Sequence, residues 1–238
     1  MGMVPPDEST NGDGRVVHRE YAGEGLDESQ LAATPLEQVR LWVADAEARQ
    51  AERGDVAEPT ALSVATVDAD GRPNVRTVLM RFFDERGPGF VTDLGSAKSR
   101  EITATGSVAA SLTWPAMYRA VRFRGRAVVV GRDEIAAYFA TRPWGSRISA
   151  WASDQSQPIA DRAALVAAYE RFAVLYPDTG APDDVPVPDG WGGWRIDCDE
   201  VELWAGRRDR LHDRLVFTRV AEGNLGTPAA WTVHRRQP

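Results

Sequence analysis

The chain has 238 residues, and its 28 lysines and arginines against 35 aspartates and glutamates give a formal net charge of −7. This acidic balance argues against general nucleic-acid binding. The single cysteine, Cys198, excludes an intramolecular disulfide framework and a cysteine zinc site, and the three histidines lie far apart in sequence. We therefore expect no metal site.

The length suits one large or two small domains. Residues 1–14 contain almost nothing to bury, so we predict a disordered tail followed by a single domain over residues 15–238. No segment approaches the roughly 20 consecutive apolar residues of a membrane span, and the first residues lack the basic and apolar regions of a secretion signal. These features predict a cytoplasmic protein without a membrane partner.

The first predicted element is a helix. Thr34 can cap it, Pro35 fits its first position, and Gly54 can end it. The pattern then becomes β-rich, with strands expected at residues 61–67, 73–83 and 89–93 and turns between them. Ser96 can cap a short helix to Ile102, and residues 107–114 and 118–130 have the pattern of a long hairpin.

The second half continues with helices and then returns to strands. Asp133 can cap a helix through Ala140, and an alanine-rich helix is expected at residues 159–175. A proline-rich, ordered or semi-rigid connector at residues 177–188 leads to strands at 191–197, 201–204, 215–220 and 231–234. Strands interleaved with a few helices, without regular alternation, predict a mainly β protein with an antiparallel barrel and appended helices.

Two segments of the first half carry candidate chemistry. Residues 76–81 place Arg76 and Arg81 on opposite faces of one apolar strand, which is costly if both faces are buried. The alternative is a strand whose arginines lie at exposed ends. Thr92, Ser96 and Lys98, the only lysine, surround a glycine turn and a helix N-terminus, which predicts an anion site. The alternative there is an ordinary capped helix with a surface lysine.

Two further arrangements lie in the middle of the chain. Tyr138, Arg142 and Ser146 follow at intervals of four residues, so on a helix and its continuation they would present a phenol, a guanidinium and a hydroxyl to one anion. Such spacing is also common by chance. Arginine alternates through residues 122–126, which indicates a solvated strand face or an oligomer interface with acidic partners.

The last candidate segment follows Trp204. Arg210, His212 and Arg214 alternate, which predicts that they share one strand face and meet an anion or carboxylates. A solvated edge strand paired with nearby aspartates is the alternative. We favour the first interpretation because the flanking Trp204, Leu211 and Leu215 have the pattern of buried residues.

With these segments in view, the sequence resembles the pyridoxine (pyridoxamine) 5′-phosphate oxidase family, flavin enzymes of the split-barrel fold. The resemblance runs in order over nearly the whole chain outside the tail. The pieces that carry it are Arg19-Glu20-Tyr21, Arg76-x-Val78-Leu79, Leu94-Gly95-Ser96-x-Lys98, Tyr138-Phe139-x-x-Arg142-Pro143, Ala150-Trp151-x-Ser153-x-Gln155-Ser156, Trp191-Gly192-Gly193, and Glu202-x-Trp204-x-Gly206 followed by Arg210-Leu211-His212-Asp213-Arg214.

The resemblance implies an antiparallel Greek-key split β-barrel with flanking helices, assembled as a homodimer that holds FMN between its subunits. The implied cofactor-binding residues are Arg76, Thr77, Val78, Leu79, Met80, Arg81, Val91, Thr92, Lys98, Gln155, Ser156, Trp204 and Arg214. The implied substrate-binding residues are Tyr21, Arg81, Tyr138, Arg142, Ser146, Arg210 and His212. Arg210 and His212 are the implied catalytic pair at the substrate ring, and no metal is implied.

Four positions depart from the family pattern. Arg81 stands where a lysine usually meets the substrate phosphate, and Ala97 replaces a common arginine near the FMN phosphate. Ala120 replaces a flavin-contacting glutamine, and His18 replaces an arginine of the lid over the site. The change at Ala97 is expected to weaken FMN binding without abolishing it.

Three functions are compatible with these residues. The first is an FMN oxidase that converts pyridoxamine or pyridoxine 5′-phosphate to pyridoxal 5′-phosphate with O2 and releases H2O2. The second is an FMN oxidase of secondary metabolism that resembles those of phenazine biosynthesis. The third is a non-catalytic flavin or pyridoxal phosphate binding protein. The Tyr138, Arg142 and Ser146 set favours the first, because a substrate without phosphate would not need it.

Overall fold

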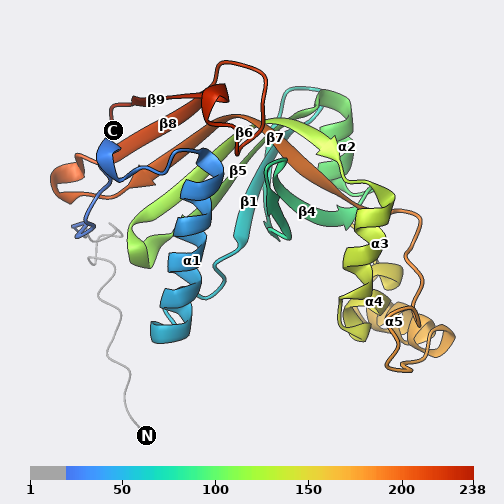
Figure 1. The fold of residues 1–238 in the computed structure, drawn as a ribbon. Coiled ribbons are helices and arrows are strands. Elements are labelled where there is room, and N and C mark those ends of the chain that lie inside the picture. Colours follow the sequence, from blue (N-terminus) through green and yellow to red (C-terminus); the bar gives the residue numbers. More distant parts are fainter. Residues whose placement is uncertain (1–19) are drawn as a thin grey trace, which may run out of the picture.

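The computed structural model describes residues 20–238 (Figure 1), so the predicted tail and His18 lie outside the described residues. The helices are α1 (Pro35–Arg53), α2 (Ala97–Thr105), α3 (Arg132–Ala140), α4 (Trp144–Ala152) and α5 (Arg162–Leu175). The strands are β1 (Ala61–Val67), β2 (Pro73–Leu79), β3 (Phe82–Asp84), β4 (Gly87–Asp93), β5 (Ser107–Trp114), β6 (Arg119–Val129), β7 (Trp191–Ala205), β8 (Asp213–Arg219) and β9 (Trp231–Arg235). Short 3-10 turns are η1 (Glu28–Gln30), η2 (Pro115–Met117), η3 (Arg208–Arg210) and η4 (Pro228–Ala230).

The strands form one curled antiparallel sheet with the path β2-β1-β5-β6-β7-β4-β3, with β8 beside β7 and β9 beside β8. Strand β7 joins the two halves of this sheet. Its residues 191–195 pair with β4, its residues between 194 and 205 pair with β6, and its residues 200–205 also pair with β8. Figure 1 shows β7 running through both halves. The predicted mainly β, antiparallel architecture with appended helices is confirmed.

Helix α1 packs against the inner face of the sheet. Thr34 caps it as predicted and accepts a 3.2 Å hydrogen bond from the Glu37 N–H, and Gly54 ends it in the left-handed conformation. Val39 and Trp42 of α1 are buried in the main core. This core also contains Leu62, Val64, Leu112, Val121, Phe123, Leu203, Leu215 and Phe217. Burial of each large apolar side chain contributes roughly 1.5–3 kcal/mol, so the apolar stripe of α1 holds it in place.

A second, smaller core lies among α3, α4 and α5 and the start of β7. It is built around Ile135, Phe139, Ile148 and Trp191. The segment at residues 177–188 forms no helix or strand and follows this core as an ordered connector, as predicted. Three side chains of α4 hold it or its start: Trp144 Nε1 donates to Tyr176 O at 2.9 Å, Trp151 Nε1 donates to Pro186 O at 2.7 Å, and Arg147 pairs with Asp184 at 2.8 Å.

The predicted strand at residues 73–83 is wrong, because the chain changes partners inside it. β2 pairs with β1 and β3 pairs with β4. Between them, the Met80 N–H donates to Thr60 O at 2.9 Å and the Arg81 N–H donates to Gly89 O at 2.8 Å. This break buries Met80 in the main core, where it is 7% exposed.

Several predicted boundaries also change. Gly131 caps α3, so Asp133 lies within the first turn, where its charge favours the helix dipole. Asp161 caps α5, which therefore begins later than predicted. The two strands expected at residues 191–197 and 201–204 form the single strand β7, because Asp199 is accommodated as a bulge opposite Arg124 and Gly125 of β6 and the pairing continues on both sides. Helix α4 was not predicted.

Among residues 20–238, no helix is both long and apolar enough to cross a membrane.

Candidate active site

Lys98 is a buried cation with neutral partners. Its side chain is 7% exposed, and Nζ donates to Thr92 Oγ1 at 3.0 Å, to Gln155 Oε1 at 2.6 Å and to Ser96 Oγ at 3.4 Å. Within residues 20–238, no carboxylate forms an ion pair with this ammonium group. Burial lowers the pKa of Lys98, and the nearby positive charge of Arg76 lowers it further. A buried cation that no carboxylate contacts directly fits an anionic ligand.

The turn between β4 and α2 creates this arrangement, which we call the Lys98 cluster (Thr92, Ser96, Lys98 and Gln155). The Gly95 N–H donates to Asp93 Oδ1 at 2.6 Å, which turns the chain after β4. Ser96 occupies the N-cap position, as predicted, but its hydroxyl makes no capping bond and lies beside Thr92 at 3.3 Å. The capping role of the Ser96 side chain was wrong, and the hydroxyl belongs to the cluster instead.

Gln155 and Ser156 approach the cluster from the loop after α4. Ser156 Oγ accepts a 3.2 Å hydrogen bond from the Ala97 N–H, so the loop contacts the first residue of α2. Ser156 has a φ of +73°, which is uncommon for a residue other than glycine. The positions predicted for the FMN phosphate and for the adjoining loop are thus brought together.

Arg76 lies next to this cluster but has a carboxylate partner. Its Nη2 donates to Glu101 Oε2 at 2.8 Å, and its Nη1 donates to Val64 O at 3.2 Å and to the Thr66 hydroxyl. Glu101 also accepts a 3.0 Å hydrogen bond from Asn74 Nδ2. The sequence did not predict Glu101 as part of the site.

A pocket of about 390 Å³ lies among the end of β2, strand β4 and the segment that joins α3 to α4. We call it the Arg142 pocket; it is lined by Val78, Leu79, Arg81, Val91, Tyr138, Thr141, Arg142, Pro143 and Ser146. Tyr138, Arg142 and Ser146 therefore converge as predicted. They do so from α3, from the loop after it and from α4 rather than from one helix and its continuation, because α3 ends at Ala140 and α4 begins at Trp144.

The guanidinium of Arg142 is placed over aromatic rings and lacks a full set of partners. Its carbon Cζ lies 4.9 Å from the ring centre of Trp191. Its Nη1 is buried and has no hydrogen-bond partner among the described residues. Burial lowers the pKa of Arg142, and the positive charge of Arg81 acts in the same direction. Both observations indicate that the pocket is built for an anion.

A third group lies at the other end of β7, and we call it the Trp204 cluster (Tyr21, Tyr118, Trp204 and His212). The ring centre of Tyr21 lies 5.2 Å from Tyr118, 5.8 Å from Trp204 and 5.1 Å from His212. Gly206 leaves the room for these contacts, since a Cβ there would lie 2.9 Å from Tyr118 Cβ and 3.0 Å from Tyr21 Cδ1. Tyr118 was not predicted, because only its contacts in space connect it to the site.

His212 carries a defined hydrogen bond. Its Nδ1 accepts from the Arg207 N–H at 3.1 Å, which leaves Nε2 as the protonated nitrogen of the neutral ring. Burial lowers the pKa of His212, and the positive charge of Arg210 adds to this effect. His212 is therefore a neutral hydrogen-bond donor at Nε2 near pH 7.

The prediction that Arg210, His212 and Arg214 share a strand face is wrong. Asp209 and Arg210 both have positive φ, +56° and +61°, so the chain makes the turn η3 and β8 begins only at Asp213. Arg210 is exposed, and Leu211 is 68% exposed rather than buried. Arg214 alone lies on the strand, opposite Trp204, and its Nη2 donates to Glu202 Oε2 at 2.7 Å.

Backbone strain is concentrated in these parts of the molecule. Within residues 20–238, the non-glycine residues with positive φ are Tyr118, Ser156, Asp209 and Arg210. All four belong to the Trp204 cluster, to the loop beside the Lys98 cluster or to η3. Such conformations persist where the surroundings determine them, and they gather at functional sites.

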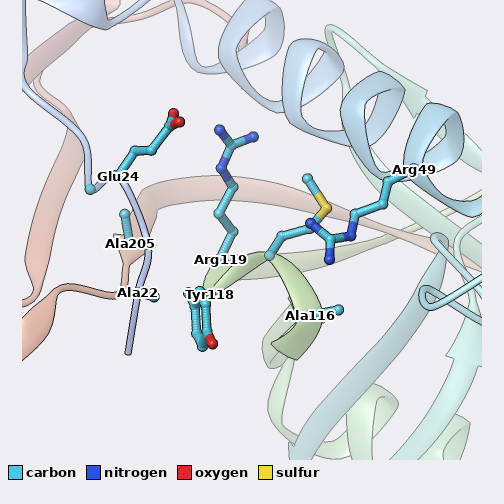
Figure 2. Close-up of a pocket in the computed structure, with 10 residues that line it drawn as sticks. Ala22, Glu24, Arg49, Ala116, Tyr118, Arg119 and Ala205 are labelled. Atoms are coloured by element: carbon cyan, nitrogen blue, oxygen red, sulfur yellow. The ribbon is translucent and has the colours of Figure 1, made fainter. Parts of the chain in front are cut away.

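Another pocket, of about 280 Å³, lies under the segment 22–25 beside the Trp204 cluster (Figure 2). It is lined by residues that include Arg49, Tyr118 and Arg119. Both arginines have carboxylate partners, since Arg49 pairs with Asp55 at 2.6 Å and Arg119 pairs with Asp45 of α1 at 2.7 Å. None of the residues implied for cofactor or substrate lines this pocket.

The remaining implied residues fall outside the three groups. Thr77 is exposed on the edge strand β2, and Met80 is buried in the main core, where its side chain is remote from solvent. Arg122 and Arg124 find the acidic partners that their alternation predicted, but within the same chain: Arg122 pairs with Glu202, and Arg124 lies 3.8 Å from Glu200.

The fold and the sequence both match known proteins. A crystal structure of a pyridoxamine 5′-phosphate oxidase-related, FMN binding protein from Nostoc punctiforme aligns with a TM-score of 0.63 and 20% identity, over 84% of this chain and 97% of that one. A crystal structure of PhzG from Burkholderia lata in complex with tetrahydrophenazine-1-carboxylic acid aligns with a TM-score of 0.78 and 28% identity, over 92% and 100%. The fold is that of the FMN-binding split-barrel proteins.

The sequence matches narrow this class. Residues 48–176 match the model of the pyridoxamine 5′-phosphate oxidase family, and residues 191–238 match the pyridoxine 5′-phosphate oxidase C-terminal dimerisation region. A pyridoxine/pyridoxamine 5′-phosphate oxidase of Streptomyces avermitilis is 47% identical over 95% of this chain and 96% of its own. One of Kineococcus radiotolerans is also 47% identical, over 92% and 96%. The chain belongs to the pyridoxamine 5′-phosphate oxidase family; it is an oxidoreductase, and FMN is its cofactor.

Proposed function

We propose that this oxidoreductase converts pyridoxamine 5′-phosphate and pyridoxine 5′-phosphate to pyridoxal 5′-phosphate. Each turnover removes two electrons from the substrate and reduces O2 to H2O2. For the amine, water then releases ammonia from the oxidised product. The printed names of relatives that are 47% identical over most of the chain support this substrate class.

The observation that carries the proposal is the Arg142 pocket. It combines a buried, unpartnered Arg142 Nη1 with the exposed Arg81, the Tyr138 phenol and the Ser146 hydroxyl. Two guanidinium groups and two hydroxyl donors suit a phosphate ester, which accepts several charge-assisted hydrogen bonds. We assign the substrate phosphate to this pocket.

The Lys98 cluster and Arg76 fit the phosphate of FMN. Lys98 is buried with three neutral oxygens, and Arg76 lies close enough to lower its pKa. When bound, FMN supplies the acceptor of the hydride from C4′ of the substrate and passes both electrons to O2. Gln155, Ser156, Trp204 and Arg214 would contact the rest of the cofactor, together with the edge of β2 from Thr77 to Leu79 and the adjoining Val91. Met80, being buried, would contribute its backbone.

Two residues are proposed to act at the substrate ring. His212 would donate a hydrogen bond from Nε2, because its Nδ1 already accepts from the Arg207 N–H. Arg210 would add a positive charge, since its guanidinium is exposed and no carboxylate pairs with it among the described residues. Tyr21 would cover the ring from the segment before η1. These groups orient the substrate for hydride loss.

A homodimer is required to bring the three groups together. Trp191, under Arg142, is the first residue of β7, and Trp204 is the penultimate one. Thirteen residue steps separate them, and a strand of that length spans roughly 40 Å. This length far exceeds a flavin. We therefore propose that the Trp204 cluster of one subunit completes the Arg142 pocket and Lys98 cluster of its partner. The match of residues 191–238 to a dimerisation region supports this assembly.

The outer face of the sheet offers a surface for the second subunit. A hollow of about 390 Å³ there is lined by small residues such as Ser63, Ala65 and Ala109 and by the charged pair of Glu202 and Arg214. Light scattering of the flavin-loaded protein tests the assembly. A mass near twice 26.1 kDa is expected, and a flavin-loaded monomer would exclude a shared site.

The second candidate is an oxidase of secondary metabolism. This candidate is supported by the similarity to PhzG, whose structure contains tetrahydrophenazine-1-carboxylic acid and whose sequence is 28% identical to this chain. The ligand in that structure is a carboxylic acid. A carboxylate has fewer acceptor oxygens than a phosphate ester, so such a ligand would accept fewer hydrogen bonds in the Arg142 pocket. The third function considered from the sequence, a non-catalytic flavin or pyridoxal phosphate binding protein, is not supported, because the chain belongs to an oxidoreductase family.

Anaerobic mixing separates a catalyst from a binding protein. We expect the purified yellow protein to bleach when pyridoxamine 5′-phosphate is added without oxygen and to regain its colour when air is admitted. Persistence of the yellow colour with both phosphate esters would refute the proposed reaction.

A further inference from the structure

Glu101 places a negative charge beside the two cations that we assign to the FMN phosphate. It lies on α2 three residues after Lys98, so both side chains share one side of the helix. Its Oε2 accepts from Arg76 Nη2 at 2.8 Å. The side chains of Arg76 and Glu101 are only 19% and 13% exposed, so water and salt screen their charges weakly.

Glu101 is ionised at neutral pH. Burial by itself raises the pKa of this carboxyl group, but hydrogen bonds from Thr66, Asn74 and Arg76 outweigh burial and hold the pKa below its ordinary value. A phosphate group that approaches Arg76 and Lys98 therefore meets a fixed carboxylate at close range, and like charges repel.

Arg76 does not depend on Glu101 for its position. Its Nη1 donates to Val64 O at 3.2 Å and to the hydroxyl of Thr66, and both acceptors belong to β1, which pairs with β2. Removal of the charge of Glu101 would therefore leave the Arg76 side chain directed at the same place.

We propose that Glu101 limits the affinity of this protein for FMN: it neutralises Arg76 and repels the cofactor phosphate, so that FMN is held less tightly than Arg76 and Lys98 alone would hold it. This inference rests on the proposed role of Arg76 and Lys98 at the FMN phosphate. The inference predicts the direction in which FMN affinity changes when Glu101 is replaced. Loss of a side chain that only supports the site weakens cofactor binding, whereas loss of a competing charge strengthens it.

The test is the Glu101→Gln variant, which keeps a carbonyl oxygen for Arg76 and Thr66 and removes the charge. The full-length protein is stripped of flavin and titrated with FMN and with riboflavin, and quenching of flavin fluorescence gives each Kd. We expect the Kd for FMN to fall about five- to tenfold at low salt, and this gain to shrink as salt is added. The Kd for riboflavin, which has no phosphate, should stay unchanged.

Two control variants make the outcome decisive. Glu134→Gln removes a carboxylate that pairs with Arg86 and Arg195 away from the site, so it should leave the Kd for FMN unchanged. Lys98→Ala tests the phosphate assignment itself. If Lys98→Ala raises the Kd for FMN but Glu101→Gln leaves that Kd unchanged or raises it, Glu101 only supports Arg76 and the inference is wrong. If Lys98→Ala raises the Kd for FMN no more than it raises the Kd for riboflavin, Lys98 does not bind the FMN phosphate. The phosphate assignment then fails, and the inference fails with it.

Discussion

The buried carboxylate of Asp213 accepts a 2.8 Å hydrogen bond from the backbone N–H of Leu26, 187 residues earlier in the chain. The same carboxylate is paired with Arg207 and Arg235. Asp213 begins β8 directly after His212, and Leu26 follows Tyr21 by five residues. One side chain therefore anchors both segments that bring Tyr21 and His212 into contact.

This anchor predicts a combined loss of stability and activity in Asp213→Ala. The Leu26 N–H would lose its buried acceptor, which costs about 1–3 kcal/mol of unfolding free energy. Because Tyr21 and His212 would both be displaced, kcat/KM for pyridoxamine 5′-phosphate should fall about tenfold or more. Urea unfolding and steady-state kinetics measure the two effects. Asp197→Ala is the matched control, since Asp197 pairs with Arg219 at an exposed position; similar losses in both variants would argue against the anchor.

Lys98→Ala should lower FMN affinity far more than turnover at saturating FMN. A charge-assisted contact to the phosphate contributes roughly 1.5–3 kcal/mol, and the proposed phosphate site is remote from the reacting part of the flavin. Flavin titration followed by kinetics at saturating FMN separates the two quantities. An equal loss of turnover at saturating FMN would show that Lys98 does more than anchor the cofactor.

Arg142→Ala should raise KM for pyridoxamine 5′-phosphate by about two orders of magnitude, since roughly 2–3 kcal/mol of charge-assisted bonding is lost. The effect should be far smaller for unphosphorylated pyridoxamine, which lacks the contact. Arg81→Lys is the matched control, because it keeps the positive charge at the pocket and should be tolerated. Unchanged kinetics with the phosphate ester would make the Arg142 pocket structural and favour the phenazine-type alternative.

The elements that the sequence predicted well are those with local signals. Thr34 and Gly54 delimit α1, and alternating apolar residues locate β1 and β5, because capping and alternation act within a few residues. Helix α4 was missed since Pro143 and Gly145 usually interrupt a helix. Here Pro143 occupies the N-cap, outside the first turn, and Ile148 buries the helix in the second core.

In the candidate site, too, the residues with local sequence signals were predicted and those that depend on contacts between distant segments were missed. Thr92, Ser96 and Lys98 were predicted together because they flank one turn, and Tyr138, Arg142 and Ser146 because they lie within nine residues of one another, although the second group does not share one helix. Glu101 and Tyr118 were missed because they join the site through contacts between distant segments, such as the ion pair of Arg76 with Glu101. The turn η3 was missed because positive φ at Asp209 and Arg210 has no signal in those residue types beyond a weak preference of aspartate.

The buried carboxylates predict a loss of stability in acid. Burial alone raises the pKa of Glu202, but hydrogen bonds and charges from Arg214 and Arg122 outweigh it, so the pKa lies below its ordinary value. A carboxyl group with a lowered pKa in the folded state stabilises the protein at neutral pH, and this contribution is lost as the pH falls from about 5 through that lowered pKa.

Urea unfolding at several pH values measures this contribution. Glu202→Gln should be less stable than the parent at pH 7, and its stability should fall less steeply below about pH 5. Parallel curves for the two proteins would show that Glu202 contributes nothing to the acid sensitivity.

The central claim, an FMN oxidase for phosphorylated vitamin B6 compounds, is tested most directly by oxygen consumption. The flavin-loaded protein is given pyridoxamine 5′-phosphate, pyridoxine 5′-phosphate and a reduced phenazine precursor in parallel, with H2O2 and pyridoxal 5′-phosphate measured as products. We expect O2 uptake with both phosphate esters, one H2O2 for each pyridoxal 5′-phosphate formed, and little uptake with the phenazine precursor. Rapid uptake with the phenazine precursor alone would contradict the claim.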